Sequence, residues 1–471
     1  MSHSDSQNKS QKLLIGTLIY AVGTFGPRLL NFFIVPFYTY YISPADMGDY
    51  ELIISNISLL TPLITLQISD GAYTWMMRDQ KQSGEYITAV YKFITFTSLL
   101  VTGVMIAINF FFPIAYFWYF LGLLIVSRLF QTIQKLLRGL NNQKLVAISG
   151  ILNTLVFLVL NVIQVVVFDM GIIALFQSTI VGNIVGILAM LIFEKRLRRI
   201  SKKEKSFPIQ KSMLKFSIPL IPNRLNWWAI SSLNKYFIKF FIGSAANGIY
   251  GVANKFPSIL QMLYNIFYES WQDTAVGDKD DSNDGFYTNV FRYYYKLSFT
   301  MLLFLIPFTK LFICFVMDER YISSAEYISF LYLGTVFQAF SSFFGVGYLK
   351  SDQTKKAGIT SVAGAVINAV ANLLLIKVIG LHAASISTFI AFFVMFVLRA
   401  YHTKSVMKVK VKWSEFFALF SISLVVTVLG VFSGVITDAC LCGAGLLLFI
   451  ALNFKEIKMI LKKGKKMIVK R

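Results

Sequence analysis

The sequence predicts an all-α polytopic membrane protein with about fourteen transmembrane helices. Of its 471 residues 56% are hydrophobic and only 14% are charged, and the mean hydropathy is +0.64. A soluble fold has no way to cover so large an apolar fraction. Apolar stretches follow one another from Leu13 to Phe454 with only short polar breaks. Each is long enough to cross the hydrocarbon core, which takes about 20 residues.

Hydropathy places the individual spans along the chain. The first apolar segment follows a polar tail with Lys9 and Lys12 and is followed by many more, so we expect a true helix and not a cleaved signal peptide. The predicted spans are 13–38, 50–74, 88–111, 116–137, 145–167, 171–193, 213–242, 249–272, 289–316, 325–349, 358–379, 382–403, 413–434 and 437–454.

The charges support an even number of spans with both termini in the cytoplasm. Lys and Arg gather in one set of alternate loops, most densely from Lys195 to Lys215, and both termini are basic. The opposite loops contain Arg320 and almost no other cation. Cytoplasmic loops carry this excess in membrane proteins, so the pattern predicts that both termini lie in the cytoplasm. The net charge of +22 is then explained by anionic inner-leaflet lipids as partners, and no nucleic acid is expected.

The sequence gives no sign of a cofactor, a metal site or a disulfide framework. The cysteines lie in or beside apolar segments, and the histidines are scattered without ligand spacing. These residues are Cys314, Cys440 and Cys442, and His3, His382 and His402. No Gly-x-x-x-x-Gly-Lys-Ser/Thr loop is present, so ATP is not expected to be the direct fuel.

A weak duplication divides the chain into two similar lobes. The block Ile42-x-x-Ala45-x-x-Gly48-x-Tyr50 recurs 200 residues later as Ile242-x-x-Ala245-x-x-Gly248-x-Tyr250. Repeated halves of this kind are common in transporters. We therefore expect an N-terminal lobe at 1–193, a basic cytoplasmic linker at 194–212, a C-terminal lobe at 213–403, and an added helix pair with a basic tail at 404–471.

With these features the chain resembles the Wzx-type oligosaccharide flippases of the MOP superfamily. The resemblance covers nearly the whole chain and rests on Gly26-Pro27-Arg28, the Ile42 to Tyr50 block, Asp70-Gly71 and the span count. It implies that the protein is not an enzyme. Its implied role is to translocate polyprenyl-diphosphate-linked oligosaccharides from the inner to the outer leaflet of the bacterial cytoplasmic (inner) membrane, for O-antigen, capsule or exopolysaccharide biosynthesis. It also implies two lobes around a cavity that opens alternately to each side, and contacts with other polysaccharide-assembly membrane proteins.

Cations inside predicted spans are the candidate substrate site. A charge at the bilayer centre costs about 2.5–3.5 kcal/mol on insertion scales, so such residues usually face protein or water. Lys235 and Lys239 follow Arg224 by 11 and 15 residues, which places all three within about 60° on one helix. A basic wall of this kind suits a lipid diphosphate. The full set of candidates is Arg28, Arg128, Arg224, Lys235, Lys239 and Lys255.

These cations also suit roles that involve no substrate. Arg224 and Lys239 could be interfacial anchors that snorkel to opposite membrane borders. Arg28 and Arg128 could instead pair with a carboxylate such as Asp70, or with helix carbonyls. Among the acidic residues, Asp70, Glu51 and Glu269 are the candidates for carrying a coupling proton.

Three other functions compete with the oligosaccharide flippase. A lipid-linked peptidoglycan precursor carries the same diphosphate, so charge does not separate it. A multidrug antiporter is disfavoured because a cationic cavity repels cationic drugs. A membrane glycosyltransferase or polymerase could use Asp46 and Asp49, but the second copy of that turn carries Ala246 and Ile249. The outer loops also leave no room for an external domain.

Overall fold

The computed structural model describes residues 30, 32–199, 206–277, 284–351 and 353–469. Within these residues the ordered elements are helices, and no strand occurs. The chain forms two compact units. Unit 1 comprises Met1–Ile42 and Asp49–Trp228, and unit 2 comprises Ser43–Gly48 and Ala229–Arg471. The all-helical fold class is therefore confirmed.

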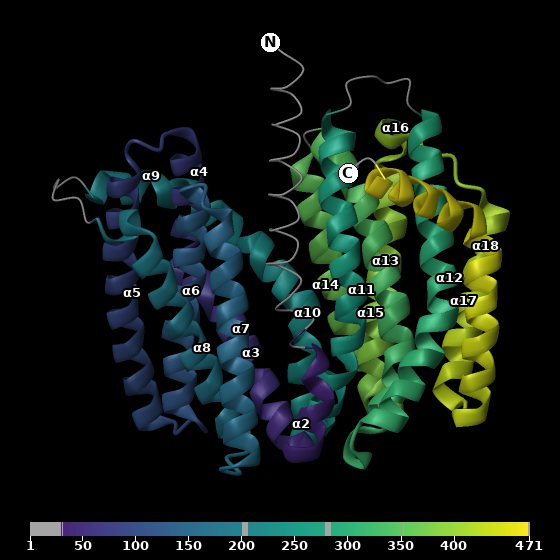
Figure 1. The fold of residues 1–471 in the computed structure, drawn as a ribbon, viewed down its shortest axis with the longest axis horizontal. Coiled ribbons are helices and arrows are strands. Elements are labelled where there is room, and N and C mark those ends of the chain that lie inside the picture. The colour runs from purple at the N-terminus through teal and green to yellow at the C-terminus, as the bar shows by residue number, and fades with distance from the viewer. Residues whose placement is uncertain (1–29, 31, 200–205, 278–283, 352, 470–471) are drawn as a thin grey trace. The chain divides into compact units, whose positions relative to one another are not determined.

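Unit 1 contains the helices up to the first part of α10 (Figure 1). Helix α3 has its first residues in unit 2, and α10 continues into unit 2. The elements are α2 (Val35–Tyr41), α3 (Pro44–Thr65), α4 (Ile68–Arg78), α5 (Ser83–Phe111), α6 (Phe117–Gly139), α7 (Gln143–Val166), α8 (Ile172–Phe193), η1 (Lys195–Arg198), α9 (Ser206–Ser217), η2 (Ile218–Leu220) and α10 (Ile221–Phe241).

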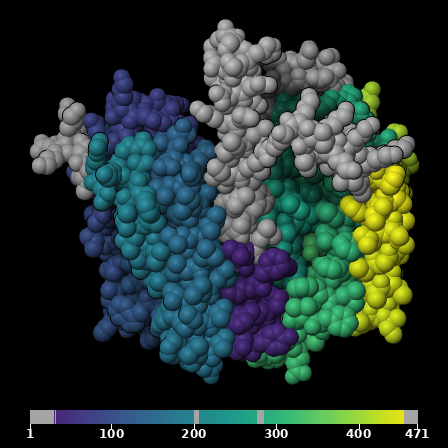
Figure 2. Space-filling view, in the orientation of Figure 1, coloured from purple at the N-terminus to yellow at the C-terminus, as the bar shows by residue number. Residues whose placement is uncertain are grey.

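Unit 2 contains the remaining helices (Figure 1). They are α11 (Ser244–Gly277), α12 (Asp284–Val316), η3 (Glu319–Tyr321), α13 (Ser324–Lys350), α14 (Thr354–Ile379), α15 (His382–His402), α16 (Lys404–Met407), α17 (Trp413–Phe432) and α18 (Val435–Val469). Figure 2 shows α18, in yellow, at the edge of this unit, and it packs along α12.

Ten described helices are long and apolar enough to cross a membrane, and up to eleven do so if one bent pair is a single span. The chain is therefore a multi-pass membrane protein. Helices α10 and α11 coincide with two further predicted spans. Their composition is not apolar enough for them to be counted among these ten helices. The first predicted span lies mostly outside the described residues, so the count of fourteen stays a prediction.

The second predicted span, 50–74, is not one straight helix. It is divided into α3 and α4, which are bent by 59°. The break falls at Leu66 and Gln67, whose φ angles of 44° and 52° are in the left-handed region. A non-glycine residue pays a steric penalty there, so the α-helix cannot continue through these two positions. The predicted span is therefore interrupted at this point.

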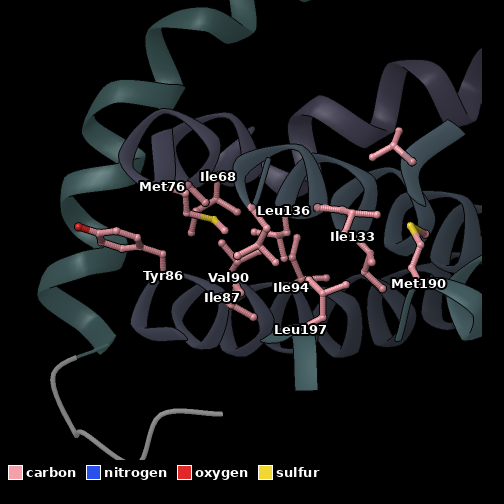
Figure 3. Packing of buried hydrophobic residues seen from close by; sticks show 14 of the residues in the cluster. Ile68, Met76, Tyr86, Ile87, Val90, Ile94, Ile133, Leu136, Met190 and Leu197 are labelled. Carbon is pink, nitrogen blue, oxygen red and sulfur yellow. The ribbon is translucent and has the colours of Figure 1, made fainter. Parts of the chain in front are cut away.

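The core of unit 1 packs around α4. Ile68, Ala72 and Met76 recur every four residues and are fully buried. Figure 3 shows Ile68 and Met76 beside Leu136 of α6 and Val90 of α5. Because residues spaced by four share one face of a helix, this stripe fixes the orientation of α4 in the unit.

The basic segment predicted as a linker, 194–212, contains ordered structure that belongs to unit 1. It includes η1 and most of α9. Leu197 of η1 is fully buried in the same core as α4, as is Met213 of α9. The apolar residues between the cations therefore attach the described part of this segment to the lobe before it.

The core of unit 2 is aromatic. Phe299 of α12, Phe337 and Phe340 of α13 and Phe416 of α17 are essentially fully buried and contact one another edge to face or at a tilt. Rings in these arrangements contribute about 0.5–1.5 kcal/mol per pair beyond the area that they bury. The added helix α17 is thus packed into the core of this unit.

The two copies of the repeated block contact each other inside unit 2. Asn247 Nδ2 donates to the Gly48 carbonyl oxygen over 2.8 Å. A Cβ atom on Gly48 would collide with the Ser244 carbonyl, and one on Gly248 would collide with the Pro44 carbonyl. The two backbones approach so closely that only glycine fits at either position. The sequence repeat thus marks a reciprocal contact between the first turns of α3 and α11.

Candidate functional site

Helix α10 carries three of the predicted site cations. Arg224 and Lys239 are exposed, and Lys235 is half-buried. The Lys239 ammonium donates to the hydroxyl of Ser244. Arg224 belongs to unit 1, whereas Lys235 and Lys239 belong to unit 2. Whether the three face one cavity stays a prediction.

Asp70, predicted as a coupling candidate, is paired with Lys135. The Lys135 ammonium lies 2.6 Å from each of the two carboxylate oxygens of Asp70. Asp70 is in the first turn of α4 and Lys135 is near the end of α6. The side chains are 21% and 32% exposed, so the pair is accessible from outside the unit.

Arg128 occupies a different environment from the one expected. It is 1% exposed in α6 and donates from Nη2 to the hydroxyl of Ser98. Its Nε and Nη1 atoms have no hydrogen-bond partner among the described residues. The alternative that Arg128 pairs with Asp70 is wrong, because the one hydrogen bond of its guanidinium goes to Ser98 and its other buried nitrogens have no partner among the described residues.

The remaining predicted site residues are dispersed. Glu51 is buried in α3, Glu269 is exposed on α11, and Lys255 is half-buried on α11. Arg28 lies outside the described residues. No group of three or more metal-ligating side chains occurs in the described part of the chain, and all three cysteines are free.

Comparison with known proteins identifies the family. The sequence matches the family described as polysaccharide biosynthesis protein over residues 13–271, which is more than half of the chain. The chain belongs to this family. No curated protein sequence matches it well enough to serve as a relative.

The fold is that of the MOP superfamily transporters. The structure of lipid II flippase MurJ in an inward closed conformation has a TM-score of 0.67 at 13% identity and covers 94% of this chain and 100% of its own. An inward-facing multidrug resistance MATE family transporter of the MOP superfamily has a TM-score of 0.66 at 13% identity and covers 82% and 96%. A MOP superfamily transporter from Pyrococcus furiosus, described as having a binding pocket of reverse polarity, has a TM-score of 0.55 at 14% identity and covers 83% and 94%. These similar proteins are a flippase and transporters, not enzymes.

Sequence reasoning missed one ion pair that this family member buries in unit 2. Lys310 of α12 lies 3.0 Å from Asp438 of α18, and their side chains are 5% and 3% exposed. Lys310 Nζ also donates to the carbonyl and the hydroxyl of Ser433, and that hydroxyl donates to Asp438 over 2.5 Å. The available signal was an ionisable residue, Lys310, inside the predicted span 289–316.

A buried arginine in unit 2 was missed as well. Arg399 of α15 is 5% exposed and donates to the hydroxyls of Thr360 and Ser361 and to the Ser341 carbonyl over 2.9–3.2 Å. These acceptors are all neutral. Because Arg399 lies in the last turn of a predicted span, the sequence did not distinguish it from the cations expected at the cytoplasmic border.

Glu194 directly follows α8 and is held by the first basic residues of the segment predicted as a linker. Arg196 Nε and Nη2 lie 2.8 Å from its two oxygens, and Asn142 Nδ2 donates over 3.0 Å. These hydrogen bonds, chiefly those from Arg196, lower the pKa of Glu194 to about 2. The carboxylate therefore fixes η1 against α7 and α8 at neutral pH.

Proposed function

We propose that this protein translocates polyprenyl-diphosphate-linked oligosaccharides from the inner to the outer leaflet of the bacterial cytoplasmic membrane, with both termini in the cytoplasm. The observation that carries the proposal is the set of cations on α10 in a member of the polysaccharide biosynthesis family. A membrane helix keeps Arg224, Lys235 and Lys239 only where protein or water surrounds them. An anionic headgroup is the ligand that such residues favour.

The physical task explains why these residues are cationic. A diphosphate and its sugars lose hydration on crossing, and an unpaired charge in an apolar medium costs several kcal/mol or more. Arginine binds phosphate oxygens in a bidentate manner, and lysine supplies a point charge. The proposed site comprises Arg28, Arg224, Lys235, Lys239 and Lys255, used in alternating access with Asp70, Glu51 or Glu269 carrying a coupling proton. Arg128 was also predicted, but its burial restricts it to a supporting role.

The test is transbilayer movement in proteoliposomes. A polyprenyl-diphosphate oligosaccharide is incorporated, and its accessibility to an external sugar-binding probe is followed. We expect transport by the wild type and at least a tenfold loss in Arg224→Ala, which corresponds to about 1.4 kcal/mol. The matched control is Arg78→Ala, which removes an exposed cation from a different helix, α4. Wild-type protein that moves no lipid under any imposed ion gradient overturns the proposal.

A second arm separates the two diphosphate substrates. The likeness to the lipid II flippase is a likeness of fold, so a lipid-linked peptidoglycan precursor is assayed beside the oligosaccharide. Faster movement of the precursor would assign this chain to that substrate instead. Expulsion of a cationic dye in the same vesicles, without lipid movement, would assign it to drug antiport.

A further inference from the structure

Arg128 places a positive charge in the interior of unit 1. The residue lies near the middle of α6 and is 1% exposed. A buried lysine or carboxylate can become neutral by losing or gaining a proton, but an arginine guanidinium keeps its charge in proteins. An isolated charge is unfavourable in an apolar interior, so other groups have to balance this one.

The described residues offer the guanidinium only one partner. Its Nη2 donates to the hydroxyl oxygen of Ser98 on α5, and that hydroxyl gives its own proton to the Ile94 carbonyl over 2.5 Å. Nε and Nη1 are buried and have no hydrogen-bond partner among the described residues. Ser98 is neutral, so it satisfies one donor without balancing the charge. Buried donors without a partner are rare, and an ion or a water usually completes them.

The acidic residues of unit 1 do not supply the balancing charge. Helices α6, α7 and α8 contain none, and the one in α5 is Glu85 in the first turn, about 20 Å along the helix from Ser98. The first predicted span, 13–38, has no acidic residue in its sequence. No carboxylate bonds to Arg128 in the described part of the chain, because its one partner is Ser98. The negative charge therefore has to come from outside the protein.

The surroundings of Arg128 favour a small ion. Along α6 the residue is preceded by Leu124 of one buried apolar cluster and followed by Ile133 of another. Ile94, one turn before Ser98 on α5, belongs to the second cluster, in which Figure 3 labels Ile94 and Ile133. With Arg128 only 1% exposed, a lipid headgroup or a sugar has no direct access to it. A monatomic anion of single charge matches both the closed surroundings and the single cation.

We propose that a chloride ion binds to Nε and Nη1 of Arg128, beside the Ser98 contact between α5 and α6. The ion balances the buried guanidinium and so stabilises unit 1. This inference goes beyond the proposed function and does not depend on which substrate the protein moves. Because a ligand that binds only the folded state stabilises that state, the stability of the protein should depend on chloride.

The test is chloride binding by the full-length purified protein in detergent. Radioactive chloride is the probe in equilibrium dialysis against sodium gluconate of constant ionic strength, and thermal unfolding is followed in chloride and in gluconate. For the wild type we expect about one bound chloride per chain. We also expect a melting temperature that is about 3 °C higher in chloride than in gluconate.

Three variants locate the ion. Arg128→Gln removes the charge and is expected to lose both the bound chloride and its effect on melting. Ser98→Asp places a carboxylate beside Nη2, so it should also lose the bound chloride but melt in gluconate no lower than the wild type does. The control is Arg138→Gln, which removes an exposed cation from the last turn of the same helix and should bind chloride like the wild type.

Two results would overturn the proposal. Wild-type protein that binds no chloride would leave water as the partner of Nε and Nη1. Chloride that Arg128→Gln and Ser98→Asp both retain would be an adventitious ion bound elsewhere. If Arg128→Gln does not fold, Ser98→Asp decides alone, because it adds the missing charge inside the protein and leaves the arginine in place.

Discussion

Each unit contains a lysine–aspartate pair between two helices. The two pairs have the same chemical groups but differ in how far they are exposed. In unit 1, Lys135 and Asp70 are 32% and 21% exposed, and the ammonium lies between the two oxygens of the carboxylate. In unit 2, Lys310 and Asp438 are 5% and 3% exposed and share the Ser433 hydroxyl. The first pair is partly exposed to its surroundings, and the second is buried.

We expect burial, more than the pairing itself, to decide how much each ion pair contributes to stability. Two desolvated charges with extra hydrogen bonds stabilise one arrangement and resist exchange. Lys310 is on α12 and Asp438 is on α18, so this pair attaches the added C-terminal helix to its unit. The Asp70–Lys135 pair is partly exposed, so it should contribute less to stability. The following predictions test this division of roles.

The largest effect is expected from breaking the closed pair. Asp438→Ala leaves the Lys310 ammonium buried without its counter-charge, which we expect to cost about 3–5 kcal/mol. Thermal unfolding of the purified protein in detergent measures the loss. The control is Asp318→Asn, because Asp318 pairs with the 41%-exposed side chain of Arg320 and should change stability little. Equal melting temperatures for the two variants would contradict a structural role for Asp438.

Removing both charges should be far milder than removing one. In Lys310→Met/Asp438→Leu no buried charge remains at this pair, and apolar replacements of buried pairs are often neutral. We expect the double variant to recover to within about 1.5 kcal/mol of the wild type. The measurement is the same unfolding experiment, analysed as a double-mutant cycle. A double variant as unstable as Asp438→Ala would show that packing, and not charge, is at fault.

The sequence was sufficient for the fold class because hydropathy and charge act over whole helices. A stretch of about twenty apolar residues must span, and alternate basic loops follow, whatever the tertiary contacts are. The two copies of the repeated block meet backbone to backbone at Gly48 and Gly248 in unit 2, a contact that the repeat alone did not predict.

The site was predicted less well because it depends on which helices are neighbours. Asp70 was recognised, but its partner Lys135 was taken as one of many cytoplasmic-border cations. The break at Leu66 and Gln67, which sets the direction of α4, involves no glycine or proline at those two positions. After the break, Ile68, Ala72 and Met76 are fully buried in the unit 1 core, and the sequence does not show which helices they pack against.

A third ion pair, on the border of unit 1, should give a smaller and pH-dependent effect. The pKa of Glu194 is lowered from 4.5 to about 2, so its stabilisation is complete above pH 4.5 and is lost as the pH falls through 2. Because Arg196 is 43% exposed, we expect Glu194→Gln to cost only about 1 kcal/mol at pH 7. The difference in melting temperature between wild type and variant should shrink at pH 3. A difference that is constant with pH would show that the Glu194 charge contributes nothing.

The smallest change in stability is expected at the open pair. Asp70→Asn keeps the shape of the side chain and leaves Lys135 accessible to solvent, so the loss should be about 1 kcal/mol or less. The unfolding experiment used for Asp438→Ala measures it under identical conditions. A loss comparable with that of Asp438→Ala would mean that the Asp70–Lys135 pair holds α4 to α6. A small loss would separate the two pairs by their contribution to stability, because only the buried pair would then fix one arrangement of its helices.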